Sequence, residues 1–206
     1  RKHSDKDLKK EFQIERLVLF SDAVFAIAIT LLIIEIKLPD VIKPYNDRGM
    51  LYVLSNILLA KFIGFVVSFI VIAMYWVNHH LLFGYLTNYS KKVIWANMFF
   101  LLTIVFMPFS SALYSEFWYD GFITPIAFYS INIMLSGIMI VRLWNIITNP
   151  ANKLCGELPP PTVIRYYKVR SLAAPAVFML AFATAYFSMF VSYMMPLIIP
   201  VVLRLI

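Results

Sequence analysis

The chain reads Arg16-Leu17-Val18-Leu19-Phe20-Ser21-Asp22 at the start of its first long apolar segment, and the run AVFAIAITLLII follows directly over 23–34. Inside a membrane helix, an ionised carboxylate or a hydroxyl is costly unless another group binds it. Ser21 and Asp22 are therefore candidates for a functional site. The groups that bind them must come from other segments of the chain.

The composition excludes an ordinary soluble domain. Hydrophobic residues make up 62% of the 206 residues, charged residues only 14%, and the mean hydropathy is +0.80. Soluble domains carry about a quarter of charged residues. The net charge of +7 also fits a nucleic-acid-binding protein, but the Lys and Arg residues flank apolar runs and form no separate basic domain. We expect an integral protein of a lipid bilayer with no nucleic-acid partner.

Six apolar runs predict six membrane-spanning helices, since about 20 residues cross a bilayer core. The runs lie at 17–38, 51–77, 93–115, 121–144, 170–190 and, shorter than the others, 193–206. Only Val191-Ser192 separates the last two runs, which predicts a tight turn there. Lys and Arg are concentrated before the first span, between the second and third, and between the fourth and fifth, which places these segments in the cytoplasm. The prediction is an all-α bundle of six helices in one domain, 17–206, preceded by a basic cytoplasmic segment, 1–16, with both termini in the cytoplasm.

The first span presents two different faces. At about 100° per residue, Ile27, Leu31, Ile34 and Leu38 fall on one narrow aliphatic stripe. Thr30 lies at the margin of this stripe, whereas Ser21 and Asp22 point away from it. We expect the polar pair to pack against other helices. By itself, the aliphatic stripe is more typical of a core or lipid contact than of a pore.

Several polar residues are predicted at the depth of Ser21 and Asp22. His79 and His80 close the second span, which runs back towards the cytoplasm, and Asn97 lies early in the third. Buried polar groups need hydrogen-bond partners, so we expect a layer that joins Asp22 to His79 or His80, together with Ser21 and Asn97. A metal site is not expected, because adjacent histidines point about 100° apart on a helix and no further ligand cluster joins them.

Two motifs together carry a family resemblance. The first is Arg16-x-x-x-Phe20-Ser21-Asp22, and the second, at the end of the second span, is Trp76-x-Asn78-His79-His80. They resemble motifs of the transmembrane protein 175 family of potassium channels, and the single copy of the first motif resembles the single-repeat prokaryotic members. The resemblance implies a structural network formed by the motif residues, which the Asn97 expected at the same depth joins: Arg16, Phe20, Ser21, Asp22, Trp76, Asn78, His79 and His80.

The resemblance also implies a function. In this family four subunits surround a pore that their first helices line, and the Thr-Val-Gly-Tyr-Gly filter of other potassium channels is absent, as it is here. The aliphatic stripe would then be the pore lining, with Ile27 at a hydrophobic constriction, Leu31 and Ile34 further outward, and Thr30 contributing to selectivity. The expectation is a homotetrameric channel that conducts potassium ions passively in a prokaryotic plasma membrane, with no catalytic activity and no cofactor.

One alternative function follows from the polar residues themselves. Asp22 and His79 also suit a proton relay, since carboxylate and histidine chains mark proton pathways in membranes. A proton-conducting or proton-coupled transporter is therefore the alternative. The sequence contains no inverted repeat of the kind that builds many transporters, which weakens this hypothesis.

Overall fold

A computed structural model describes residues 5–36, 46–117 and 121–205, and in these ranges the chain is all-α apart from one isolated bridge between Leu86 and Cys155. The helices are α1 (Asp5–Ile34), α2 (Asp47–Val53), α3 (Leu59–Phe83), α4 (Lys91–Val105), α5 (Met107–Glu116), α6 (Ile123–Ile147), α7 (Pro161–Ser171), α8 (Ala173–Thr184), α9 (Met189–Met194) and α10 (Ile199–Leu205). A π-helical segment, Leu54–Leu58, joins α2 to α3, and short 3₁₀ helices lie at Pro150–Asn152 and Met195–Ile198.

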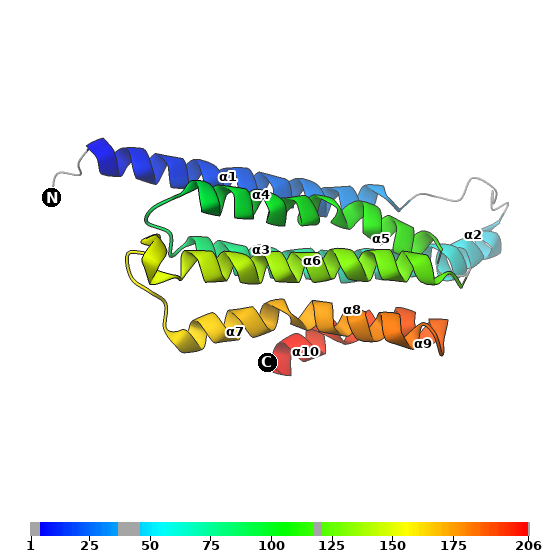
Figure 1. Ribbon diagram of the computed structural model, residues 1–206. Helices are drawn as coiled ribbons and strands as arrows, with labels where there is room; N and C mark the ends of the chain where they lie inside the picture. Colours follow the sequence, from blue (N-terminus) through cyan, green and yellow to red (C-terminus); the bar gives the residue numbers. More distant parts are fainter. Residues whose placement is uncertain (1–4, 37–45, 118–120, 206) are drawn as a thin grey trace.

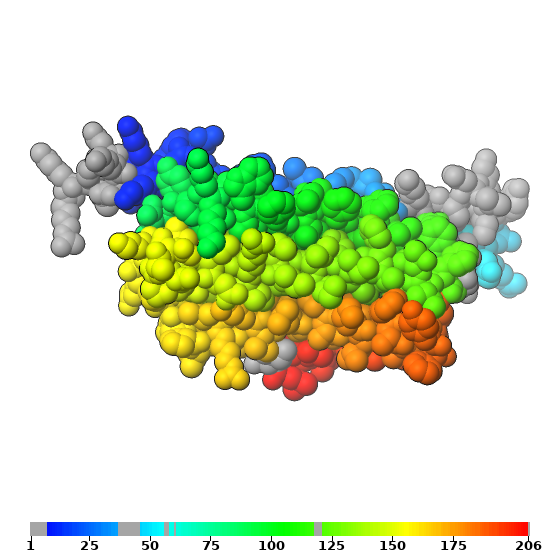
Figure 2. Space-filling view, in the orientation of Figure 1, coloured from blue at the N-terminus to red at the C-terminus, as the bar shows by residue number. Residues whose placement is uncertain are grey.

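The long helices lie side by side in an elongated bundle (Figure 1). Helix α1 runs along one edge, α7 to α10 run along the opposite edge, and α3, α4, α5 and α6 lie between them. The space-filling view shows α1 and α4 next to each other along one edge of the molecule (Figure 2). Helix α6 is central, and its large side chains Ile126, Tyr129, Ile133, Leu143 and Trp144 are completely buried.

The helix boundaries follow from capping residues and prolines. Ser90 begins α4, because its side chain accepts a hydrogen bond of 3.3 Å from the Val93 N–H. The long third segment is divided into α4 and α5 just before Pro108, and the fifth is divided into α7 and α8 just before Pro175. A proline has no N–H and its ring clashes with the preceding turn, so the regular helix is interrupted there.

Four of the predicted spans are confirmed as helices that are long and apolar enough to cross a membrane. These are Leu8–Ile34, Lys61–Phe83, Lys91–Glu116 and Ile123–Ile147. Helix α1 begins at Asp5, so the predicted N-terminal segment is helical over its described residues. Leu38, the last member of the predicted stripe, lies outside the described residues.

The final part of the chain differs from the prediction. The fifth segment covers 161–184 rather than 170–190, and Val191 and Ser192 lie inside α9 instead of forming the turn. The turn comes before Ser188, whose hydroxyl accepts a hydrogen bond of 3.4 Å from the Val191 N–H and so begins α9. The sequence between the two segments, 185–188, carries no charge and only one serine, so hydropathy could not place the boundary, whereas the serine cap does.

Two loops at the end of the bundle that also holds the described start of α1 are joined to each other (Figure 1). The N–H groups of Thr87 and Asn88, between α3 and α4, donate to the Leu154 carbonyl oxygen at 2.9 and 3.1 Å. Leu154, between α6 and α7, is almost completely buried. The backbone groups of these loops therefore bind one another, which fixes the ends of α3, α4 and α6.

Candidate functional site

Helix α1 contains the most apolar stretch among the four long helices, and this stretch is also the least buried. Only 22% of its most apolar window is buried in the subunit, against 50–56% for the other three. Its buried side is formed by Ser21, Phe25, Ala28 and Leu32. Packing inside one subunit therefore leaves most of a strongly hydrophobic helix uncovered.

The predicted aliphatic stripe lies on the uncovered side of α1. The exposed fractions of Ile27, Leu31 and Ile34 are 58%, 38% and 64%. Ser21, which the helical period places about 120° away around the helix, is completely buried. Within one subunit, the stripe is thus free to line a pore, to meet another subunit or to face lipid.

Thr30 is also exposed, at the margin of the stripe. Its hydroxyl group donates inside the helix, to the carbonyl oxygens of Ala26 at 3.0 Å and Ile27 at 2.9 Å. Since a hydroxyl has one hydrogen and two lone pairs, this arrangement leaves oxygen lone pairs available on the exposed side. Thr30 therefore offers an oxygen ligand one turn from Ile27.

A buried polar chain ties α1 to α3 and α4. The Asn97 amide donates to the Ser21 hydroxyl oxygen at 2.9 Å, and its carbonyl oxygen lies 2.9 Å from His79 Nε2. The Ser21 hydroxyl in turn donates to the Leu17 carbonyl oxygen at 2.8 Å. The His79 ring stacks on Phe83 with 3.9 Å between ring centroids. The expected joining of Ser21, Asn97 and His79 is therefore present.

Asp22 binds a different partner from the one expected. The Trp76 indole N–H donates to Asp22 Oδ1 at 2.9 Å, and among the described hydrogen bonds none joins Asp22 to His79 or His80. Trp76 precedes His80 by one helical turn and stacks on it with 5.4 Å between ring centroids. The expected pairing of Asp22 with a histidine is wrong, because the indole group of Trp76 occupies the position beside the carboxylate.

Asn78 belongs to a third set of contacts, away from α1. The Trp144 indole N–H donates to Asn78 Oδ1 at 2.7 Å, and the Asn78 amide donates to Ser171 Oγ at 2.5 Å and to the Tyr167 carbonyl oxygen at 3.2 Å. The motif at the end of α3 therefore binds four neighbouring helices: Trp76 binds α1, His79 binds α4, and Asn78 binds both α6 and α7. Sequence reasoning missed Trp144, Tyr167 and Ser171, whose only signal was a tryptophan near the end of an apolar span.

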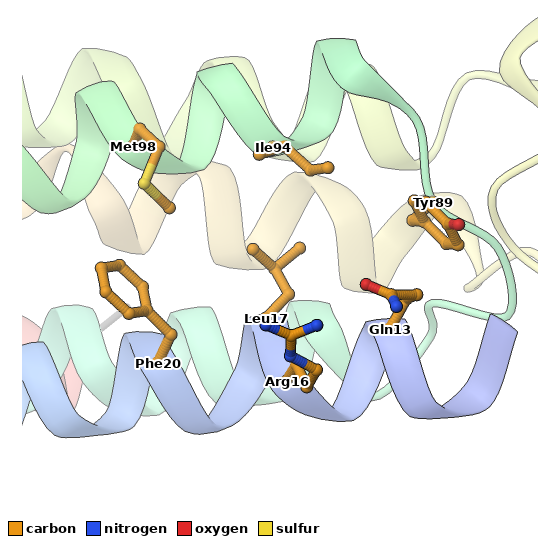
Figure 3. A pocket seen from close by; sticks show the side chains of 7 residues that line it. All are labelled: Gln13, Arg16, Leu17, Phe20, Tyr89, Ile94 and Met98. Atoms are coloured by element: carbon orange, nitrogen blue, oxygen red, sulfur yellow. The ribbon is translucent and has the colours of Figure 1, made fainter. Parts of the chain in front are cut away.

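Arg16 and Phe20 lie apart from the buried chain. They line a cavity of about 300 Å³ between α1 and the region around the start of α4 (Figure 3). Its other lining residues are Gln13, Leu17, Tyr89, Ile94 and Met98. The Arg16 guanidinium carbon lies 5.8 Å from the Phe12 ring centroid, and no carboxylate of a described residue pairs with Arg16. Arg16 and Asp22 thus do not share partners within one subunit.

Two charged residues, Lys61 and Glu35, lie at the end of the bundle opposite to the start of α1. Lys61, inside the second predicted span, pairs through Nζ with Glu116 Oε2 at 2.6 Å, which joins the start of α3 to the end of α5. Glu35 follows α1 directly and is exposed. Among the described residues, no three His, Cys, Asp or Glu side chains gather closely enough to hold a metal ion.

Comparison with known proteins agrees with the motifs. The profile of the family described as "Endosomal/lysosomal potassium channel TMEM175" matches residues 16–108, which contain both motifs. A protein named as a potassium channel from Streptomyces collinus is 31% identical over 176 residues, which cover 82% of this chain and 83% of that protein. Another protein named as a potassium channel, from Chamaesiphon minutus, is 30% identical over 178 residues, 86% of each chain.

The same fold occurs in a solved structure. The crystal structure described as a lysosomal potassium-selective channel TMEM175 homolog from Chamaesiphon minutus superposes with a TM-score of 0.72 and 25% sequence identity. The match covers 94% of this chain and 97% of that one. The family is one of ion channels rather than enzymes. The chain is therefore a multi-pass, all-α membrane protein that belongs to the TMEM175 family.

Proposed function

We propose that this protein is a potassium channel in which four copies of the chain surround one pore lined by their α1 helices. The observation that carries the proposal is that α1 holds the most apolar stretch of the long helices and that this stretch is the least buried, with Ile27, Leu31 and Ile34 on its uncovered side. The relatives named as potassium channels support the choice of ion. Four copies arranged with these stripes inward would cover the exposed face of each α1.

In this arrangement Ile27 forms the hydrophobic constriction. Rings of four branched aliphatic side chains offer an ion no ligands, and a narrow apolar passage can close to ions by losing its water. Conduction therefore requires the α1 helices to splay or rotate until a partly hydrated ion passes. The Thr30 oxygens would then supply part of the coordination that selects potassium over sodium.

The contacts of Ser21 and Asp22 anchor α1 during that movement. Ser21 is bound to Asn97 on α4 and Asp22 is bound to Trp76 on α3, both one to two turns from Ile27. Beyond Asp22, the buried side of α1 packs through the apolar residues Phe25, Ala28 and Leu32. Apolar contacts are not directional, so this half of α1 can shift while the polar anchors hold its other half.

We further propose that both termini lie in the cytoplasm and that the membrane is a bacterial plasma membrane. Lys91 and Lys92 begin α4 at the same end of the bundle as the described start of α1, which carries Lys9, Lys10 and Arg16. This clustering of basic residues supports the orientation through the positive-inside rule. The alternative proton relay gains no support, because Asp22 and His79 take part in separate hydrogen bonds.

The proposal is tested by ion flux into vesicles. Purified protein in liposomes is given a potassium gradient or an equal sodium gradient, with and without a protonophore, and protein-free liposomes serve as the control. We expect the potassium flux to exceed the sodium flux. The protonophore should accelerate the potassium flux, because the protons that it carries compensate the charge that potassium moves. Proton movement without potassium permeability would refute the channel proposal and favour the proton relay.

A further inference from the structure

A second cavity lies on the side of the bundle formed by α3, α7 and α10. Its volume is about 260 Å³. Apolar side chains of α3 form one wall, among them Phe69, Ala73 and Val77, and Tyr167, Arg170 and Leu203 close the other side. Phe69 and Val77 are 42% and 46% exposed. The cavity is thus an open apolar groove with one cationic group at its edge.

The charge at this groove is not neutralised by the protein. Residues 158–206 contain Arg165, Lys168, Arg170 and Arg204 but no Asp or Glu. Arg170 Nη1 donates to the Tyr166 hydroxyl at 2.8 Å and to the Leu203 carbonyl oxygen at 3.3 Å, and no described carboxylate pairs with it. A guanidinium has five N–H donors and suits phosphate groups, so most of its donors remain for an anion.

The position of the charge along the groove matches the shape of a phospholipid. Asn78, which lines the groove together with Arg170, lies five residues before the end of α3, or about 7 Å from it. Phe69 lies nine residues deeper, which is about 13 Å further along the helix axis. One leaflet of a bilayer core is about 15 Å thick. A phosphate at Arg170 would therefore leave one acyl chain lying along Val77, Ala73 and Phe69.

We propose that this groove binds one anionic phospholipid of the leaflet at the α3 C-terminal end, with its phosphate on Arg170 and an acyl chain along α3. The identification of that leaflet as the cytoplasmic one rests on the orientation proposed above, whereas the rest of this proposal does not. Anionic lipids are favoured over zwitterionic ones because the basic side chains of α7 have no acidic neighbours between 158 and 206.

Native mass spectrometry of the delipidated full chain tests the proposal. Phosphatidylglycerol and phosphatidylcholine with the same acyl chains are added separately, and bound lipid is counted from the mass. We expect phosphatidylglycerol to bind more tightly, and Arg170→Gln to weaken it by about fivefold. Arg165→Gln is the matched control, because Arg165 lies on the same helix but outside the groove, and it should change binding little.

A second variant keeps the test informative if Arg170→Gln disturbs α7 or α10. Ala73→Phe fills the apolar part of the groove without changing charge, and it should also reduce phosphatidylglycerol binding. Equal binding of the two lipids, or equal losses in Arg165→Gln and Arg170→Gln, would overturn the proposal. An altered number of subunits in Ala73→Phe with unchanged lipid binding would show that a second copy covers the groove. This experiment measures lipid binding and not ion flux. Its outcome is therefore independent of whether the channel proposal fails.

Discussion

Ser21 and Ile27 lie about 120° apart around helix α1: Ser21 is completely buried and accepts a hydrogen bond from Asn97, whereas Ile27 is 58% exposed. The same helix therefore has one face bound firmly inside the subunit and another that the subunit does not cover. This division separates residues that should anchor α1 from residues that should line the pore.

Replacing Ile27 with Asn should raise basal potassium flux severalfold, because an amide keeps water in a passage that four isoleucine side chains keep dry. Flux from potassium-loaded proteoliposomes measures the effect. Ile33→Asn is the matched control, since Ile33 is also exposed, at 50%, but lies about 120° away around the helix. Equal increases in both variants would contradict the assignment of Ile27 to the constriction.

Asp22→Ala should damage assembly more than ion selectivity. It removes the acceptor of the Trp76 indole N–H, and a hydrogen bond to a charged group contributes about 1.5–3 kcal/mol. Size-exclusion chromatography measures the intact oligomer, and flux in potassium and sodium gradients measures selectivity. Asp22→Asn retains an acceptor oxygen and should be milder. A fully assembled Asp22→Ala protein with altered selectivity would place Asp22 at the pore instead.

Asn97→Ala should destabilise the protein by about 1–3 kcal/mol, because Ser21 and His79 both lose a buried partner. Thermal unfolding in detergent measures the loss. Asn132→Ala is the comparison, since the Asn132 amide donates to Ser110 at 3.1 Å between α6 and α5, away from α1. Both variants should melt earlier, but only Asn97→Ala should change potassium flux. Unchanged flux in Asn97→Ala would show that the layer does not anchor the conducting helix.

Gly137→Ala should destabilise the bundle by about 1–3 kcal/mol through overpacking. A Cβ atom on Gly137 would lie 2.5 Å from Pro175 Cγ and 3.2 Å from the Ser171 carbonyl oxygen, so α6 and the α7–α8 segment would have to separate. Gly64→Ala is the milder control, because its Cβ would meet the Ser115 Cβ atom at 3.1 Å. Melting temperatures that fall equally would argue against a special close approach at Gly137.

Removing the Lys61–Glu116 pair should cost less than about 1 kcal/mol, even though its atoms lie 2.6 Å apart. The Glu116 side chain is 60% exposed, so solvent and salt screen the attraction. A double-mutant cycle with Lys61→Met and Glu116→Gln, followed by thermal unfolding at low and high salt, isolates the pair. A coupling of several kcal/mol that salt does not reduce would contradict this expectation.

The first four spans were predictable because hydropathy and length report directly on burial in a bilayer. The last two segments were placed less well, since the chain is apolar across their junction and the serine cap at Ser188 marks the turn only weakly in sequence. The hydrogen-bonded chain of Ser21, Asn97 and His79 was also predictable, because the sequence places these residues at the same depth in the membrane. Depth does not determine which side chains at one level contact each other, so the prediction paired Asp22 with a histidine instead of Trp76.

The sequence by itself determined that this is an α-helical membrane protein of the TMEM175 family, and that one face of its first helix is purely aliphatic. These properties depend on local composition and helical period, which the order of residues specifies directly. The tertiary structure alone decided that Trp76, His79 and Asn78 each bind different helices, and that α3, α7 and α10 enclose a groove beside Arg170. Such contacts depend on the rotation of each helix about its axis, which is set by the packing of all the helices together.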